Sequence, residues 1–242
     1  CCNMVCAYCT IPSVRPGLSS VPAPELEARV RALAAAGVPE IVLCGIRLGR
    51  YLRREPGEPR TDLAGLVARL LEVPGDFRLR LSSLEVTDAS DRLLDLMAAS
   101  GGRLCPHLHL PLQSGSDPVL KRMRRWYSAG GYRRRVDAYR ERVPGGALFA
   151  DVMTGFPGAP AAEPAASLRF ARALAFDGLH LFRHSPRPGT EAAAWPVPPD
   201  AVVKRRAGEW RALDESRRAA HAARAVGQER VAAPALDGRE GV

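Results

Sequence analysis

The sequence predicts an α/β protein built on a parallel β-sheet, and three observations carry that prediction. Short apolar segments alternate with segments of helix-forming composition along most of the 242 residues. Hydrophobic residues make up 46% of the chain, enough for one large core. Polar and glycine-rich residues follow the expected strands in four loops, as in folds whose ligands bind at the carboxyl ends of parallel strands. These loops cover residues 45–49, 82–85, 113–116 and 155–158.

The expected elements alternate between helix and strand in chain order. The first helix covers residues 22–36, between a proline at its start and Gly37 at its C-terminal cap. The first strand, residues 40–46, has the apolar composition of a strand buried on both faces. Asp88 is the expected N-cap of the helix over 88–100. The other expected helices cover residues 61–72, 117–123, 131–143, 161–175 and 198–225, and the other expected strands cover residues 77–85, 107–113, 147–155 and 178–185.

This alternation favours right-handed crossovers in either an open doubly wound sheet or a barrel. Five strands are expected where a closed partial barrel would need six. The chain opens on cysteine with no strand before it, so we expect a fragment whose first strand is missing.

The chain carries a formal charge of +9, which favours a polyanionic partner such as nucleic acid. A soluble surface from an arginine-rich proteome explains the charge equally well. No apolar run approaches the roughly 20 residues of a membrane-spanning helix, and no secretory leader is visible. We therefore expect a cytoplasmic protein.

Three of the six cysteines, Cys2, Cys6 and Cys9, lie within nine residues, while the others are scattered without a disulfide rhythm. Thiolates bind iron-sulfur clusters and zinc. Structural zinc sites usually take four ligands from two paired knuckles, and no second pair follows here. Three thiolates on a 4Fe-4S cluster would leave one iron open for another ligand.

The Cys-x3-Cys-x2-Cys spacing, with Tyr8 before the last cysteine, resembles the signature of the radical S-adenosylmethionine (SAM) superfamily. Six blocks in order narrow the resemblance to the methylthiotransferase family, closest to the branch that modifies threonylcarbamoyladenosine in tRNA. The isopentenyladenosine branch ranks second. The blocks are CNMVCAYCTIP at 2–12, EIVLCGIRLGRY at 40–51, RLRLSSLE at 78–85, LCPHLHLPLQSGSDPVLKRMRRWY at 104–127, DVMTGFPG at 151–158 and HLFRHSPRPGTEAA at 180–193.

The resemblance implies a partial (β/α)6 radical SAM barrel over residues 1–197, a closing helix over 198–226, and the start of a truncated RNA-binding domain over 227–242. It also implies a 4Fe-4S cluster on Cys2, Cys6 and Cys9, with SAM on its open iron. A second 4Fe-4S cluster would belong to the complete enzyme and not to this chain. The expected partners are a tRNA anticodon loop and an electron donor such as flavodoxin or ferredoxin, with the chain itself monomeric.

By the same resemblance, the SAM-contacting loops fall at Tyr8, Gly45, Ser83, Glu85, Gln113, Ser114 and Gly155. Two of these have equally good structural interpretations: Glu85 as a helix-capping or solvated carboxylate, and Gln113 as a polar strand end. His107 and His109 share one strand face, and hydrogen-bonded structural roles are favoured over ligand roles. Asp151 is expected to have a partner, because an unpaired buried carboxylate is costly.

Basic and aromatic residues are interleaved after the Gln113 loop, and arginine pairs with phosphate while aromatic rings stack on unpaired bases. The predicted tRNA contacts are Lys121, Arg122, Arg124, Arg125, Trp126 and Tyr127. A solvated helix face is the alternative. For the whole chain, the alternatives are another radical SAM reaction on RNA or a non-catalytic RNA-binding remnant.

Overall fold

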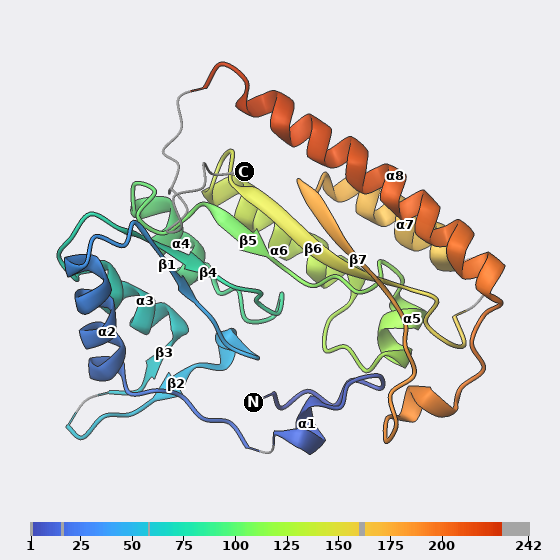
Figure 1. Ribbon diagram of the computed structural model, residues 1–242, viewed down its shortest axis with the longest axis horizontal. Coiled ribbons are helices and arrows are strands. Elements are labelled where there is room, and N and C mark those ends of the chain that lie inside the picture. The colour runs from blue at the N-terminus through green and yellow to red at the C-terminus, as the bar shows by residue number, and fades with distance from the viewer. Residues whose placement is uncertain (1, 16, 58, 160–162, 229–242) are drawn as a thin grey trace.

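The computed structural model describes residues 2–15, 17–57, 59–159 and 163–228, and parallel strands lie at its centre (Figure 1). One pair and one triplet of strands are hydrogen-bonded in parallel, and a parallel bridge between Leu79 and Leu104 links the second strand of the pair to the approach to the triplet. The spatial order of the parallel strands therefore follows their order in the chain, as in a barrel that is open on one side. The pair is β1 (Glu40–Leu43) and β4 (Arg78–Leu81), and the triplet is β5 (His107–His109), β6 (Ala147–Thr154) and β7 (Gly178–Arg183).

Among the described residues, six longer helices accompany the strands. The helices pack on the apolar side of the sheet. In β6, buried and partly exposed residues alternate strictly, so one face of this strand is covered and the other is not. Leu148 and Val152 are buried in the main core, whereas Phe149 and Asp151 face the opposite, concave side. The helices are α2 (Ala23–Ala35), α3 (Leu63–Leu71), α4 (Asp91–Ala99), α6 (Ala129–Arg142), α7 (Glu163–Leu174) and α8 (Asp200–Ala225).

Short elements lie in the loops around the rim of the sheet. The strands β2 (Leu52–Arg53) and β3 (Thr61–Asp62) form a small antiparallel ribbon that the sequence pattern does not predict. The short helices are α1 (Ile11–Val14), η1 (Leu48–Arg50), α5 (Asp117–Arg122) and η2 (Glu191–Ala194). The end of α5 and the helix η2 form backbone hydrogen bonds to the cysteine loop, the segment over residues 2–9 that carries Cys2, Cys6 and Cys9.

The expected α/β architecture is confirmed, but β1 differs from the expectation of burial on both faces. Val42 is 48% exposed, and Glu40, on the same face, binds Arg78 and Arg80. Hydrogen bonding from Arg80 and then Arg78 outweighs burial and lowers the pKa of Glu40 to about 2. The face of β1 that points away from the helices therefore carries ion pairs, which a run of apolar residues in the sequence does not predict.

The expected N-cap at Asp88 is wrong. Helix α4 begins three residues later, and the hydroxyl of Ser90 accepts a hydrogen bond from the backbone N–H of Leu93 at 3.3 Å. Asp88 instead accepts from Arg47 at 3.0 Å. Gly49 allows this approach, because a Cβ there would lie 2.2 Å from the Cβ of Asp88.

Helix α8 lies along β7 and joins the main core through Trp210 and Leu213 (Figure 1). Its Asp214 accepts a hydrogen bond from the backbone N–H of Leu179 at 2.6 Å. Most of the expected RNA-binding domain, residues 229–242, lies outside the described residues. Within the described chain, no helix is both long and apolar enough to cross a bilayer.

Replacing Ser90 with alanine should lower the melting temperature by about 2–4 °C, because losing a cap of this kind costs roughly 1 kcal/mol. Ser90→Asn, which can still cap the helix, should melt within about 1 °C of the parent. Thermal unfolding followed by circular dichroism measures both variants. Equal melting temperatures for Ser90→Ala and the parent would rule out this cap as a stabilising contact.

Candidate functional site

The cysteine loop lies across the carboxyl ends of the strands and is held there by neighbouring elements (Figure 1). Its thiols, Cys2, Cys6 and Cys9, are free and partly buried. The backbone of Ala7 fixes the loop from both sides: its N–H donates to the carbonyl of Met123 at 3.1 Å, and its carbonyl accepts from Ala192 at 2.8 Å. A small second core beneath the loop comprises Ala7, Val119, Met123, Phe156 and Ala192.

Arg125 joins this loop to the rim of the sheet. Its guanidinium lies 3.4 Å from the Cys6 sulfur and 3.4 Å from the Tyr8 hydroxyl, and it forms an ion pair with Glu85. Only 4% of the Arg125 side chain is exposed. Burial raises the pKa of the Cys6 thiol, and the charge of Arg125 opposes that rise. The Arg125 side chain thus places a permanent positive charge beside one candidate ligand.

The end of α5 explains why Arg125 points inward. Arg124 adopts φ of 57°, which is uncommon for a residue other than glycine. The N–H of Arg125 bonds to the carbonyl of Leu120 at 2.9 Å, and that of Arg124 bonds to Lys121 at 3.0 Å. This is the Schellman pattern of helix termination. It reverses the chain and directs the next side chain under the cysteine loop.

A second buried arginine holds the start of the loop. The Arg47 side chain is 2% exposed; it pairs with Asp88 and donates to the side-chain oxygen of Asn3 at 2.5 Å. Its guanidinium also lies 4.9 Å from the centre of the Trp126 ring. The sequence pattern indicates no role at this site for Arg47, and it indicates a helix cap and not an ion pair for Asp88. Their only local signal is Gly49, whose missing side chain makes room for Asp88.

Three of the expected SAM-contacting residues follow the carboxyl ends of β1 and β4. Gly45 and Ser83 are exposed on the rim. Glu85 is neither a helix cap nor a solvated carboxylate, because Arg125 binds it. Tyr8 packs edge-to-face on Phe156 with ring centres 6.0 Å apart, and burial raises the pKa of its hydroxyl.

The other expected SAM-contacting residues lie after β5 and β6. Gln113 has φ of 59°, an uncommon backbone conformation for a residue other than glycine. The hydroxyl of Ser114 is buried against Ser167, so this side chain does not face the rim. Gly155 has φ of 74°, and a Cβ on it would lie 2.9 Å from a methyl group of Val203 on α8.

The predicted RNA contacts divide into two groups. Arg125 and Tyr127 face inward: the first binds Glu85, and the Tyr127 hydroxyl donates to the carbonyl of Leu112 at 2.8 Å. We therefore do not retain these two as RNA contacts. The exposed members of the set are Lys121, Arg122, Arg124 and Trp126.

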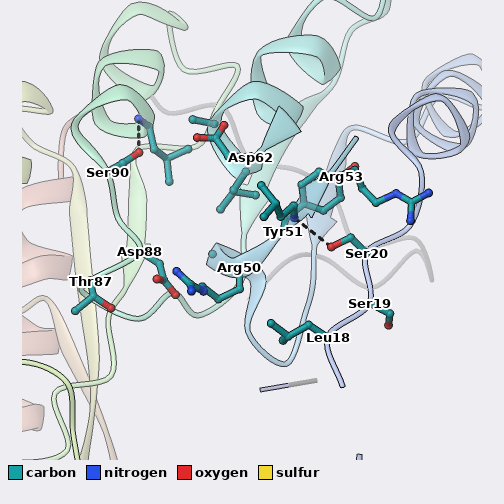
Figure 2. Close-up of a pocket in the computed structure, with 15 residues that line it drawn as sticks. Leu18, Ser19, Ser20, Arg50, Tyr51, Arg53, Asp62, Thr87, Asp88 and Ser90 are labelled. Atoms are coloured by element: carbon teal, nitrogen blue, oxygen red, sulfur yellow. Dashed lines mark hydrogen bonds between the residues drawn. The ribbon is translucent and has the colours of Figure 1, made fainter. Parts of the chain in front are cut away.

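Two of the surface cavities near this rim each have a volume of about 630 Å³. The first lies beside Arg50, Tyr51 and Asp88 and contains none of the three cysteines (Figure 2). The second lies between the start of α4 and the length of α6, and its lining residues include Trp126, Arg134, Arg135 and Arg142. This basic and aromatic groove is continuous with the exposed residues predicted to contact RNA.

The residues of the loop fit an iron-sulfur cluster. Three thiols come from one loop, and the Nε of Arg125 is buried beside them without a hydrogen-bond partner among the described residues. The described chain has one group of three potential ligands close enough to share a single ion, and the three cysteines are not that group. A cluster separates its thiolates more widely than a single zinc ion does, so the donor set favours iron-sulfur over zinc.

Comparison with solved structures shows a fold shared with radical SAM enzymes. Coproporphyrinogen III oxidase from Escherichia coli matches 89% of this chain and 50% of its own, with a TM-score of 0.62 and 16% identity. The methyltransferase TsrM from Kitasatospora setae matches 79% of this chain and 37% of its own, with a TM-score of 0.61 and 16% identity. At these identities the similarity concerns the fold.

Curated relatives confirm the resemblance to methylthiotransferases. The threonylcarbamoyladenosine tRNA methylthiotransferase MtaB of Thermotoga maritima is 38% identical over 79% of this chain and 43% of its own length. A tRNA-2-methylthio-N(6)-dimethylallyladenosine synthase of Citrifermentans bemidjiense is 38% identical over 80% of this chain and 43% of its own. The chain thus spans about two fifths of these relatives. Residues 1–171 match the family model of the Radical SAM superfamily, and we conclude that the chain belongs to that superfamily.

Proposed function

We propose that this chain is the radical SAM core of a tRNA methylthiotransferase that adds a methylthio group to C2 of N6-threonylcarbamoyladenosine beside the anticodon. The observation that carries the proposal is the cysteine loop, held over the strand ends by Ala7 and joined to Glu85 through Arg125. The similarity to methylthiotransferases of both branches supports a methylthiolation of tRNA, and the order of the six sequence blocks favours the threonylcarbamoyladenosine branch. Sulfur would come from the second cluster of the complete enzyme.

In this proposal Cys2, Cys6 and Cys9 hold the cluster, which together with SAM supplies a one-electron reductive cleavage when both are bound. The residues of the chain orient and shield that centre. Arg125 donates to the Cys6 sulfur, and Tyr8 and Phe156 pack beneath the loop and exclude water. Arg47 fixes Asn3 and therefore the backbone next to Cys2. SAM would lie on the rim formed by Gly45, Ser83, Gln113 and Gly155.

The tRNA would approach along the exposed end of α5 and the residues that follow it. Lys121 and Trp126 are exposed there, and Arg134 lies in the adjoining groove. Some of the basic charge is already neutralised, since Arg135 binds Asp91 and Arg124 binds Glu191. The contacts that support RNA binding are therefore fewer than the sequence alone suggests.

The isopentenyladenosine branch is the second candidate, and a specific finding supports it. The dimethylallyladenosine synthase of Citrifermentans bemidjiense is as similar to this chain as the MtaB relative, at 38% identity in each case. The two substrates differ in charge, because threonylcarbamoyladenosine carries a carboxylate and isopentenyladenosine carries an apolar chain. Preferential binding of one modified anticodon stem-loop would distinguish the two branches.

Anaerobic reconstitution of the chain should give about four irons and a broad visible absorbance, both lost in Cys6→Ala. Cys44→Ala is the matched control, since Cys44 lies on the same rim and is exposed. Iron analysis and absorbance measure loading, and 5′-deoxyadenosine formed on reduction measures SAM cleavage. A colourless chain that still binds tRNA would support the non-catalytic remnant instead.

Replacing Arg125 with glutamine should make the reduction potential of the cluster more negative by on the order of 60 mV, a tenfold change for one electron. The reason is that a positive charge and a hydrogen bond beside a ligand sulfur favour the reduced form. Lys121→Gln, an exposed change on the preceding helix, should leave the potential unchanged. A redox titration followed by electron paramagnetic resonance measures both variants.

If Arg125→Gln does not load iron, Arg125→Lys keeps the positive charge but not the forked guanidinium, and its cluster should have a reduction potential at or slightly below that of the parent. Equal potentials in the parent and in a loaded Arg125→Gln chain would exclude a role for this residue in tuning the cluster. Loss of SAM cleavage without a change in potential would indicate a role limited to holding Glu85.

Removing Trp126 and Lys121 together should weaken binding of an anticodon stem-loop that carries threonylcarbamoyladenosine. Loss of one stacked base costs about 1–3 kcal/mol, and loss of one phosphate contact lowers the salt slope by about 1. Lys204→Gln is the control, because this lysine is exposed on α8 and pairs with Asp200. Fluorescence anisotropy at several salt concentrations measures both, and an unchanged slope in the double variant would place the RNA elsewhere.

A further inference from the structure

Three neighbouring strands bring His109, Asp151 and His180 together on the concave face of the sheet. The parallel register pairs Asp151 directly with His180, and it pairs His109 with Phe149, two residues before Asp151. Residues two apart on a strand point to the same side. The three side chains are therefore neighbours as a consequence of strand pairing, on rigid elements and not on loops.

The distances within this group suit coordination of one ion. Nε2 of His109 lies 2.7 Å from Oδ1 of Asp151, and Nδ1 of His180 lies 3.4 Å from the same oxygen. All three potential ligand atoms lie within 4.8 Å of one another. Bonds of about 2.0–2.1 Å in a tetrahedral site place ligand atoms roughly 3.3–3.4 Å apart. The His180 to Asp151 separation already matches, the His109 to Asp151 separation needs to open by about 0.6–0.7 Å, and the widest separation in the group, at most 4.8 Å, needs to close.

The charge of Asp151 also points to a cation. Its side chain is 16% exposed, and among the described residues its ion-pair partners are these two histidines, with no arginine or lysine. A carboxylate this deep is costly without a positive partner. Other acidic residues beside the sheet have such partners: Glu40 binds two arginines, and Asp177 binds Arg140 and Arg224.

Ser83 adds the outer contact that metal-binding histidines commonly have. Its hydroxyl lies 3.4 Å from Nδ1 of His109, on the opposite side of the ring from Asp151. When Nδ1–H donates to Ser83, Nε2 carries a lone pair that faces a carboxylate oxygen, and a cation between them removes the repulsion. When Ser83 donates instead, Nε2–H bonds to Asp151 and no ion is needed. These two arrangements are chemically distinct and can be separated by experiment.

We propose that His109, Asp151 and His180 form a second metal site, which takes one divalent first-row transition ion such as Zn²⁺ and is separate from the cysteine loop. Two imidazoles and one carboxylate are the ligands of zinc and its neighbours; Mg²⁺ and Ca²⁺ prefer oxygen. Three protein ligands leave at least one position open. His180 is the most accessible of the three, with 46% of its side chain exposed, and gives the ion a route from solvent.

The test measures zinc on the full chain after anaerobic loading of iron, so that the cluster cysteines are already occupied. The chain is dialysed against Zn²⁺, and zinc and iron are counted by mass spectrometry. We expect one zinc per chain in addition to the iron. X-ray absorption at the zinc edge should show nitrogen and oxygen ligands at about 2.0–2.1 Å and no sulfur at about 2.3 Å.

His180→Gln should weaken zinc binding by at least about 100-fold, and His109→Gln should do the same. His180 is half exposed, so its variant keeps the test valid even if His109→Gln folds poorly. The matched control is His221→Gln, which removes a histidine bound to a different aspartate, Asp177. Iron loading serves as an independent readout and should be unchanged in His180→Gln.

Three results would overturn this proposal. They are the absence of zinc beyond that bound by thiols, sulfur ligands at the zinc edge, and equal zinc affinity in the parent and in His180→Gln. The first would leave the group as a hydrogen-bonded network with a shared proton. None of them bears on the cluster proposed at the cysteine loop, because that is measured by the iron count.

Discussion

The site depends on one buried cation, the guanidinium of Arg125. The cysteine loop has no regular secondary structure of its own, so its position must come from contacts with other elements. Arg125 meets that need by contacting Cys6, Tyr8 and Glu85 at once. A buried charge of this kind is tolerated only when it is paired. Glu85 supplies the pairing charge, which ties the loop to the end of β4.

The rest of the rim repeats this arrangement on a smaller scale. Arg47 is paired with Asp88 and reaches Asn3 at the start of the loop, while the backbone of Ala7 is held from both sides. Elements far apart in sequence thus converge on residues 2–9. Parallel strands make this possible, because their carboxyl ends meet at one edge and their loops can all reach the same point.

Local sequence patterns predicted the alternating elements and their order well, since apolar runs and helix-forming segments are local properties. The boundaries were less predictable: β5 ends at His109, although apolar letters continue to Leu112. The direction of the Arg125 side chain depends on the left-handed backbone of Arg124. Glycine is the usual sequence signal for that conformation, and this position is not a glycine. The partners of Glu85 and Asp88 are about 40 residues away, so their roles depend on tertiary contacts that composition does not encode.

The contact between Gly155 and Val203 limits how the protein can diverge. A side chain at 155 would collide with the first turns of α8, and its backbone angle also disfavours any other residue. Shortening Val203 would remove the collision but not the conformational strain. The loop after β6 and the start of α8 are therefore coupled through this contact, since a larger residue at position 155 requires a smaller one at position 203 and still leaves the backbone strained.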